Sequence, residues 1–201
     1  MGDAKVVVFD VETSGLDPAV HEVIQFAAVA VDAAWQPVGE LELKIKFDPE
    51  KADPTALELN SYEEGAWKEA ISQAEAVARI GNFLKRHASW TKTSKAGKPY
   101  TVARLCAHNA RFDCDFLAAM FKRAGGSFCP AAIYEPLDTL ALARWVTLCA
   151  AGSPPYDHKL GTLLEHFGIA LGGDSHDALG DVKSTVNLAH FLASIVTNGA
   201  F

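Results

Sequence analysis

An apolar run near the start of the chain, interrupted by two acids, constrains the fold more than any other feature. Residues 5–16 have the sequence KVVVFDVETSGL, and the β-branched residues up to Val11 predict a buried central strand. Asp10 and Glu12 break this apolar pattern. Because residues two apart in a strand point to the same face, both carboxylates should project together near the end of the strand, just before a turn.

This acid pair needs a positively charged partner. Two unit charges about 5 Å apart repel by roughly 3 kcal/mol at an effective dielectric of 20. No Lys or Arg lies between Lys5 and Lys44, so a local ion pair is missing. A bound divalent cation is the favoured partner, and solvated carboxylates at a strand end are the alternative.

Length and composition predict a single domain over residues 1–201. The chain is 49% hydrophobic, which is enough to bury a sizeable core, and it shows no repeat, low-complexity tract or clear domain boundary. The formal net charge of −7 argues against a strongly basic protein that coats duplexes without specificity. It does not exclude a nucleic-acid substrate, because bound divalent metals would offset part of this charge.

The cysteines and the hydropathy pattern predict a cytoplasmic protein without a membrane segment. Cys106, Cys114, Cys129 and Cys149 form neither a CxxC pair nor a zinc-binding spacing, so we expect buried thiols in a reducing compartment. We find no secretory signal, and no apolar run approaches the roughly 18 residues of a membrane span.

Hydrophobic periodicity predicts both helices and strands after the first strand. Short polar turns favour antiparallel pairing of the first three strands. The expected elements are strands over 23–31 and 38–47, helices over 54–57 and 69–87, a loop over 89–101, strands over 102–107 and 133–137, a helix capped by Asp138, a helix over 160–167 that stops at Gly168, and a last helix from about 178.

The loop over 89–101, SWTKTSKAGKPYT, is the one concentrated basic feature. It contains Lys92, Lys95 and Lys98 with no acid, together with Trp90 and Tyr100. Such a loop could touch phosphates and stack on bases. The alternative is an ordinary solvated connection.

Two further acids begin helices. The strand over 102–107 runs into HNARFD, so Asp113 falls in the first turn of an amphipathic helix, where the helix dipole favours an acid. Asp181 falls in the first turn of the last helix if Asp177 is its N-cap, and His176 would then lie in the preceding loop, able to swing over the site that Asp181 faces. Each residue alone could equally be an ordinary helix-start acid or a surface His.

Together these segments resemble the three exonuclease motifs of the DEDDh (DnaQ-like) 3′–5′ exonucleases. The matching patterns are D-x-E at Asp10 and Glu12, H-N-x-x-F-D ending at Asp113, and H-x-A-x-x-D from His176 to Asp181. The resemblance extends to DTLALAR at 138–144 and HKLGTLLEHFGI at 158–169, as in the proofreading epsilon subunit of bacterial DNA polymerase III. A basic loop longer than usual between the first two motifs is the main departure.

The resemblance implies a fold and an activity. The implied fold is α/β and ribonuclease H-like, with a mixed five-stranded sheet flanked by helices on both faces. The implied activity is metal-dependent 3′–5′ hydrolysis of single-stranded ends, DNA rather than RNA, releasing nucleoside 5′-monophosphates. Two Mg²⁺ or Mn²⁺ ions are the implied cofactors, because two-metal phosphodiester hydrolysis needs an oxygen-rich site.

The resemblance also implies a role for each motif residue. Asp10 would bridge both ions, Glu12 and Asp181 would hold the ion that carries the attacking water, and Asp113 would support the second ion. His176 would act as the general base, as suits an imidazole at neutral pH. The remaining motif residues would surround the terminal nucleotide, with Leu16 as a wedge against its base: Thr13, Ser14, Gly15, Leu16, His108, Asn109 and Phe112.

Two alternatives stay open at this point. One is an RNA-trimming exonuclease similar to ribonuclease T or oligoribonuclease. The other is a non-catalytic module that binds nucleic acid or a polymerase, although an idle relative would have little reason to keep four like charges together. A polymerase or a repair protein is a candidate partner.

Overall fold

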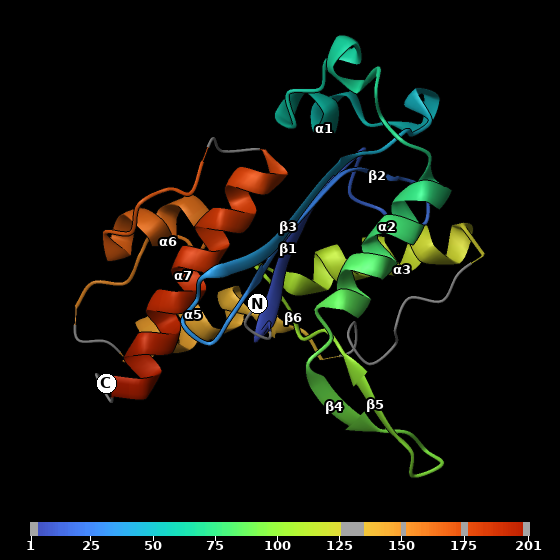
Figure 1. The fold of residues 1–201 in the computed structure, drawn as a ribbon. Coiled ribbons are helices and arrows are strands. Elements are labelled where there is room, and N and C mark those ends of the chain that lie inside the picture. Colours follow the sequence, from blue (N-terminus) through green and yellow to red (C-terminus); the bar gives the residue numbers. More distant parts are fainter. Residues whose placement is uncertain (1–3, 126–134, 150–151, 174–176, 199–201) are drawn as a thin grey trace.

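A mixed five-stranded sheet forms the centre of the molecule (Figure 1). The computed structural model describes residues 4–125, 135–149, 152–173 and 177–198. The strand order is β3-β2-β1-β6-β7. These strands span Val6–Thr13 (β1), Val23–Val31 (β2), Pro37–Lys44 (β3), Leu105–Ala107 (β6) and Leu137–Asp138 (β7).

The first three strands form an antiparallel meander, as their short turns predict. β1 pairs with β2 from Val6↔Val31 onwards, and β2 pairs with β3. Every residue of β2 is buried, whereas β3 is partly exposed, as suits its place at one edge of the sheet. On its other side β1 pairs in parallel with β6, which pairs in parallel with β7.

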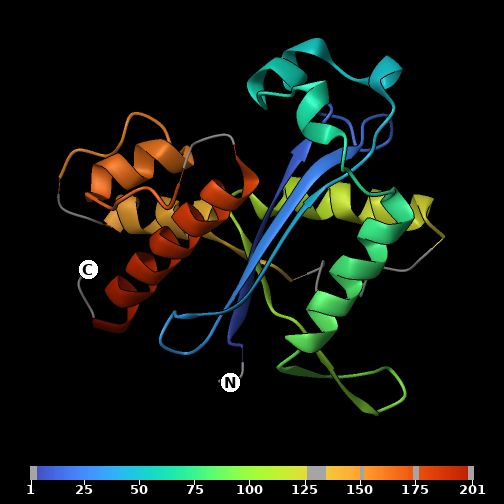
Figure 2. The same ribbon diagram turned by 45° about the horizontal axis from the view of Figure 1, so that its top comes forward.

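Helices cover both faces of the sheet, as Figures 1 and 2 show. Alternate residues of β1 divide between two cores, because side chains in a strand alternate between faces. Val7 and Phe9 pack with α2 (Gln73–Arg86) and α3 (Ala110–Arg123), and Val6 and Val8 pack with α7 (Ala178–Asn198). The helices span Pro54–Leu59 (α1), Gln73–Arg86 (α2), Ala110–Arg123 (α3), Thr139–Cys149 (α5), Leu160–Phe167 (α6) and Ala178–Asn198 (α7), with 3-10 turns at Pro49–Lys51 (η1) and Glu64–Trp67 (η2).

A third cluster of apolar side chains joins α5, α6 and α7. Its buried members include Ala143, Leu163 and Leu188, one from each helix. The helices α5 and α6 are therefore held against α7, which itself packs on the sheet.

The basic segment over 89–101 is a β-hairpin, so the loop prediction was wrong. Trp90–Thr93 (β4) pairs antiparallel with Pro99–Val102 (β5). The Lys92 ammonium lies over the Trp90 ring and forms a 2.8 Å salt bridge with Glu135. The alternation of Thr, Lys and aromatic residues suits a two-stranded ribbon. Each strand has only four residues, so the pairing was not recognised in the sequence.

Several other sequence predictions need correction. The predicted strand over 102–107 is divided, because Val102 ends β5 and β6 begins at Leu105. The predicted strand over 133–137 is described only from residue 135, where the strand comprises Leu137 and Asp138. Cys106 and Cys114 are buried as expected, but Cys149 is exposed, and Cys129 lies outside the described residues.

The search for membrane-spanning helices had a negative result. Within the described segments, none of the helices combines the length and the apolar character that crossing a membrane requires.

Candidate active site

Three carboxylates from two distant segments meet at one edge of the sheet. Asp10 and Glu12 come from β1, and Asp181 comes from the first turn of α7. Each offers an oxygen, and these oxygens all lie within 4.8 Å of one another. The prediction that Asp10 and Glu12 project together is therefore confirmed, and Asp181 joins them.

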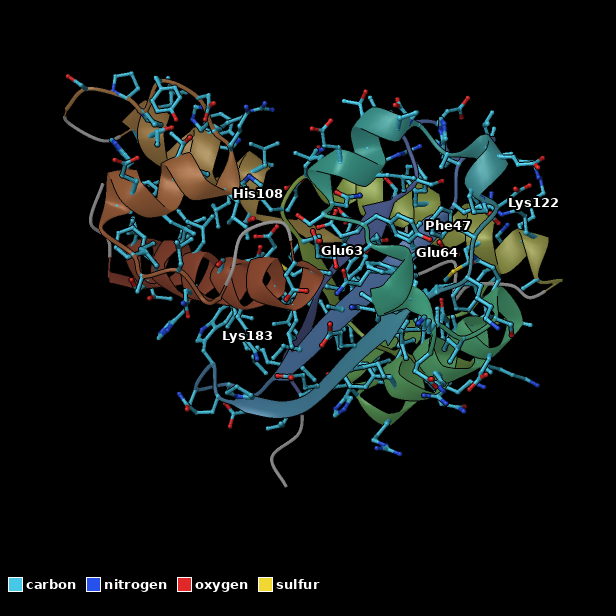
Figure 3. All side chains as sticks on the ribbon, turned by 90° about the horizontal axis from the view of Figure 1, so that it is seen from above. Phe47, Glu63, Glu64, His108, Lys122 and Lys183 are labelled. Carbon is cyan, nitrogen blue, oxygen red and sulfur yellow. The ribbon has the colours of Figure 1, made fainter. Side chains whose placement is uncertain are left out.

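The topology explains why the acids gather there. The strands β1, β6 and β7 are parallel, so their carboxyl ends lie at the same edge, where α/β proteins place their ligand sites. The helix α3 begins three residues after β6, and α5 begins directly after β7, so the amino ends of both helices face this edge. Seen from above, His108 lies between the α5–α7 helices and the segment that contains α1 (Figure 3).

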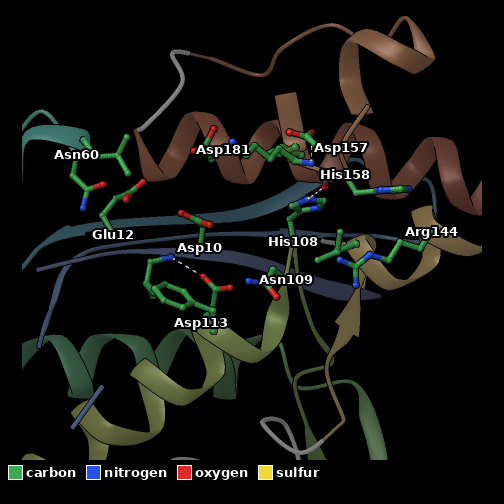
Figure 4. Close-up of a pocket in the computed structure, with 16 residues that line it drawn as sticks. Asp10, Glu12, Asn60, His108, Asn109, Asp113, Arg144, Asp157, His158 and Asp181 are labelled. Atoms are coloured by element: carbon green, nitrogen blue, oxygen red, sulfur yellow. Dashed lines mark hydrogen bonds between the residues drawn. The ribbon is translucent and has the colours of Figure 1, made fainter. Parts of the chain in front are cut away.

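Asp113 is tied to β1 by its side chain. Its Oδ1 accepts a 3.1 Å hydrogen bond from the Val11 backbone N–H (Figure 4). The paired register of β1 with β6 ends at Val8↔Cys106, so the carboxylate supplies an acceptor where the neighbouring strand has already ended. Asp113 is buried in the first turn of α3, as predicted, and it lines the same pocket as the three clustered acids.

Burial and mutual repulsion make these carboxylates reluctant to ionise. Burial, followed by the charges of Asp113, Glu12, Asp181 and Asp177, raises the pKa of Asp10 well above its usual range. Burial and the neighbouring Asp181 and Asp177 raise the pKa of Glu12 to about 7. Clustered acids with raised pKa values are typical of a site that binds a cation.

Burial also dominates at Asp113. It raises the pKa of this carboxyl to about 8, and the backbone hydrogen bonds from Val11 and from its own residue oppose that rise.

A pocket of about 830 Å³ contains this acidic cluster (Figure 4). Glu12 and Asn60 lie at one end, Asp10, Asp181 and Asp113 lie in the middle, and His158 and Arg144 lie at the other end (Figure 4). The full lining is Asp10, Val11, Glu12, Leu59, Asn60, His108, Asn109, Phe112, Asp113, Leu140, Arg144, Asp157, His158, Lys159, Leu160 and Asp181.

His108 has both ring nitrogens engaged. Its Nδ1 lies 2.9 Å from Thr139 Oγ1, and its Nε2 lies 2.9 Å from the His158 carbonyl oxygen. Since a carbonyl only accepts, Nε2 carries the proton. Burial lowers the pKa of His108, so a neutral ring suits this position.

Asn109 and Phe112, the other predicted residues of this segment, also line the pocket. Asn109 adopts a left-handed conformation, with φ of 66°, and its N–H donates to Asp138 Oδ1 at 3.1 Å. The Phe112 ring packs against Phe116 with centroids 4.8 Å apart. Asp138 also accepts the Leu140 N–H at 2.9 Å, which supports its predicted role as the cap of α5.

The turn after β1 is built by its own side chains. Thr13 donates its hydroxyl to the Gly15 carbonyl at 2.7 Å, and the buried Ser14 hydroxyl accepts the Glu22 N–H at 2.9 Å. A Cβ at Gly15 would collide with the His21 ring, so this position requires glycine. The pocket lining does not include the predicted turn residues Thr13, Ser14, Gly15 and Leu16. The Leu16 side chain is 79% exposed.

Asp177 caps α7, which meets the condition on which the predicted position of Asp181 depended. Its Oδ2 accepts the Gly180 N–H at 3.2 Å, and its carbonyl accepts the Asp181 N–H at 2.9 Å. Its Oδ1 accepts a 3.0 Å hydrogen bond from Gln25 of β2, which fixes the start of α7 against the sheet. His176 lies outside the described residues, so its predicted role as a general base stays a prediction.

Sequence reasoning missed four residues toward the two ends of the pocket, namely Asn60, Arg144, His158 and Lys159. Asn60 donates its side-chain N–H to the Thr13 carbonyl at 2.9 Å and is buried. Arg144, His158 and Lys159 come from α5 and from the segment before α6. The segments DTLALAR and HKLGTLLEHFGI contain all three, but no spacing rule connected them to the acids.

The donor set of the three clustered acids fits a divalent metal of the Mg²⁺ or Mn²⁺ type. Carboxylate oxygens are the ligands that these hard cations prefer, and three of them converge here. The described part of the cluster contains no thiol or imidazole ligand, which zinc sites commonly use.

The chain belongs to the exonuclease family. The family model described as Exonuclease (RNase_T) matches residues 7–96 and 100–189. This range contains all four motif acids and His176. The DnaQ-like resemblance of the motifs is thereby confirmed.

Two named relatives illustrate the similarity. A DNA polymerase III subunit epsilon-like protein of Rhodobacter capsulatus is 30% identical over 181 residues, covering 89% of this chain and 22% of that protein. Ribonuclease T of Photorhabdus laumondii is 26% identical over 195 residues, covering 90% of this chain and 80% of that protein. The chain thus spans less than a quarter of the first relative and most of the second.

Solved structures of exonuclease I share the fold. A product-bound exonuclease I superposes with a TM-score of 0.73 at 18% identity, over 96% of this chain and 44% of that chain. Escherichia coli exonuclease I in complex with a dT13 oligonucleotide gives a TM-score of 0.71 at 21% identity, over 96% of this chain and 42% of that chain. The ribonuclease H-like fold is therefore confirmed.

Proposed function

We propose that this chain is a metal-dependent 3′–5′ exonuclease that removes nucleoside 5′-monophosphates from single-stranded ends. One observation carries the proposal. Three carboxylates from β1 and α7 converge within 4.8 Å at the carboxyl edge of an exonuclease-family fold, inside a pocket large enough for a nucleotide. Acids placed in this way repel one another unless a cation binds between them.

Asp10, Glu12 and Asp181 would hold the metal ions, and Asp113 would support them from across the pocket. When bound, two such ions would polarise the scissile phosphate and lower the pKa of the attacking water. Asp113 also fixes the end of β1 through its bond to Val11 N–H, so it keeps Asp10 and Glu12 in register with the pocket. This rigid placement serves catalysis, because a displaced ligand loses much of the rate.

His176 is the proposed acceptor of the proton from the attacking water. It is the residue directly before Asp177, which caps α7, and it is five residues before Asp181. A neutral imidazole can take a proton at neutral pH, as the family resemblance implies. His108 suits this role less well, because both of its nitrogens are already hydrogen-bonded.

We propose that the terminal nucleotide lies between the turn after β1 and the segment that follows β6. Phe112 lines the pocket and offers an aromatic surface on which a base can stack. His108 and Asn109 line it beside Phe112, while Thr13, Ser14 and Gly15 shape the turn. Leu16 is exposed and therefore free to wedge against a base.

Single-stranded DNA is the proposed substrate, and RNA is the second candidate. The dT13 complex of exonuclease I shares this fold and supports DNA. The match to ribonuclease T, which covers 80% of that protein, supports RNA. Discrimination depends on contacts to the 2′-hydroxyl.

The experiment uses 5′-end-labelled single-stranded DNA and RNA of equal sequence. With Mg²⁺ or Mn²⁺ we expect a ladder that shortens from the 3′ end, with nucleoside 5′-monophosphates as products and faster cleavage of DNA. Faster cleavage of RNA would instead support an RNA-trimming exonuclease. Internal cleavage, or binding without cleavage, would contradict the exonuclease proposal.

A polymerase or repair partner, a cytoplasmic location and a single-domain organisation stay predictions of the same proposal. The epsilon-like relative of Rhodobacter capsulatus supports a link to replication.

A further inference from the structure

The end of the pocket away from Glu12 carries two positively charged side chains. Arg144 from α5 and Lys159, directly before α6, both line the pocket. Figure 4 shows Arg144 on the opposite side of Asp10 from Glu12. Both side chains are exposed, and among the described residues neither forms a salt bridge.

Asp157 is the carboxylate at this end among the described lining residues. Its Oδ1 accepts the Lys159 backbone N–H at 3.0 Å, so it is occupied in shaping the segment before α6. Two cations and one acid leave a net positive charge at this end, whereas the middle of the pocket is acidic. The pocket is therefore polarised along its length.

Two contacts of His158 attach the segment that contains Lys159 to the rest of the site. The His108 ring donates to the His158 carbonyl at 2.9 Å, and the His158 ring lies 2.9 Å from Thr147 Oγ1 of α5. These bonds hold the segment against the end of β6 and against the helix that bears Arg144. The position of the cations relative to the acids is consequently built into the fold.

The amino end of α6 opens at the same place. Lys159 is the N-cap residue, its side chain makes no capping hydrogen bond, and Leu160, the first residue of the helix, lines the pocket. The first N–H groups of a helix lack partners within the helix and attract anions. The Asp157 carboxylate already lies at this helix end, against the Lys159 N–H and the Thr162 side chain, so the two cations without salt bridges are the groups available to an incoming anion.

We propose that Arg144 and Lys159 bind the phosphate one nucleotide upstream of the scissile phosphate. This inference rests on the proposed exonuclease function, which places the scissile phosphate at the acids. A 3′-hydroxyl end has no phosphate beyond its last nucleotide, so the next phosphate in the chain is the upstream one. The preferred substrate class is therefore an oligonucleotide that carries at least two phosphates.

Two dinucleotides that differ by one phosphate test this proposal. The dinucleotide dTpT carries only the scissile phosphate, and its 5′-phosphorylated form pdTpT carries the upstream phosphate as well. Since a charge-assisted contact to phosphate is worth about a factor of ten, the wild-type protein should show a KM about tenfold lower for pdTpT. The substitutions Arg144→Gln and Lys159→Gln together should remove that difference.

Lys68→Gln with Arg86→Gln is the matched control, because both side chains are exposed and neither lines the pocket. This control should keep the wild-type ratio of the two KM values. A ratio that stays the same in the Arg144 and Lys159 variant, or a wild-type ratio near one while dTpT is hydrolysed, would overturn the phosphate subsite and leave the exonuclease function standing. Failure of the wild-type protein to hydrolyse either dinucleotide or a longer single strand would overturn both.

Discussion

Replacing Glu12 by Gln is expected to stabilise the protein in the absence of metal, by an amount that grows as the pH rises from the ordinary pKa of Glu, 4.5, to its folded pKa of about 7 and is largest above that value. Burial and the neighbouring acids raise the pKa of Glu12 from 4.5 to about 7. A raised carboxyl pKa means that the fold favours the protonated form, so stability is highest below the unfolded pKa and is lost as pH rises through the folded pKa. Gln cannot ionise and avoids this loss.

The expected size follows from the pKa difference. At about 1.4 kcal/mol per pKa unit, ionisation of Glu12 costs the folded state roughly 3 kcal/mol once the pH exceeds its folded pKa. Between about pH 5 and about pH 8, the wild-type protein should lose about 2 to 3 kcal/mol more than Glu12→Gln. With a denaturant slope of about 2 kcal/mol per molar urea, the difference between the urea midpoints of the wild-type protein and Glu12→Gln should change by about 1 M between the two pH values.

Urea unfolding in EDTA, followed by circular dichroism at both pH values, measures this quantity. Glu165→Gln is the control, because Glu165 is exposed on α6 and the substitution makes the same chemical change. Saturating Mg²⁺ should remove the pH-dependent loss in the wild-type protein, since a bound cation favours the ionised carboxylates. Equal pH dependence of wild type and Glu12→Gln in EDTA would refute the electrostatic reasoning.

Three further substitutions address the other motif residues. Asp10→Ala should abolish hydrolysis while metal-free stability holds or rises, because one of several mutually repelling acids is removed; turnover assays and urea unfolding check this. Asp113→Asn should lose activity but keep the bond from Val11 N–H, whereas Asp113→Ala should also lose about 1 to 3 kcal/mol of stability, measured by the same unfolding assay. His176→Ala should reduce turnover by about 10²–10⁴-fold with metal and substrate binding largely kept, and the wild-type rate should rise with pH through the imidazole titration. An unchanged acidic limb of the pH–rate profile in His176→Ala would make this His a bystander.

The sequence predicted those parts of the site that follow from local patterns. The alternation of β1 placed Asp10 and Glu12 on one face, and the cap at Asp177 placed Asp181 in the first turn of its helix, and both positions are confirmed. The antiparallel meander followed from the short turns between the first three strands. The placement of helices on both faces of the sheet was implied by the family resemblance. Family resemblance was still needed to bring β1 and α7 together, because no local rule gives a contact between residues so far apart in sequence.

The parts that sequence reasoning missed depend on tertiary contacts. The basic segment over 89–101 pairs with itself as a hairpin at the amino end of β6, and none of its residues lines the pocket. Arg144 and Lys159 line the pocket only because α5 and α6 are packed against α7. Asp113 can accept the Val11 N–H because β6 stops pairing with β1 before it reaches Val11. Strand propensity does not show where that pairing ends.

Manganese binding, measured in the same samples as hydrolysis, tests the central claim most directly. EDTA-treated wild-type protein should bind Mn²⁺ saturably, detected by electron paramagnetic resonance, and should regain hydrolysis of a single-stranded oligonucleotide in proportion to the bound metal. Asp10→Asn should lose tight Mn²⁺ binding and hydrolysis together. Hydrolysis that continues in excess EDTA, or full activity of Asp10→Asn without bound metal, would contradict the assignment of the acidic cluster as the metal site of an exonuclease.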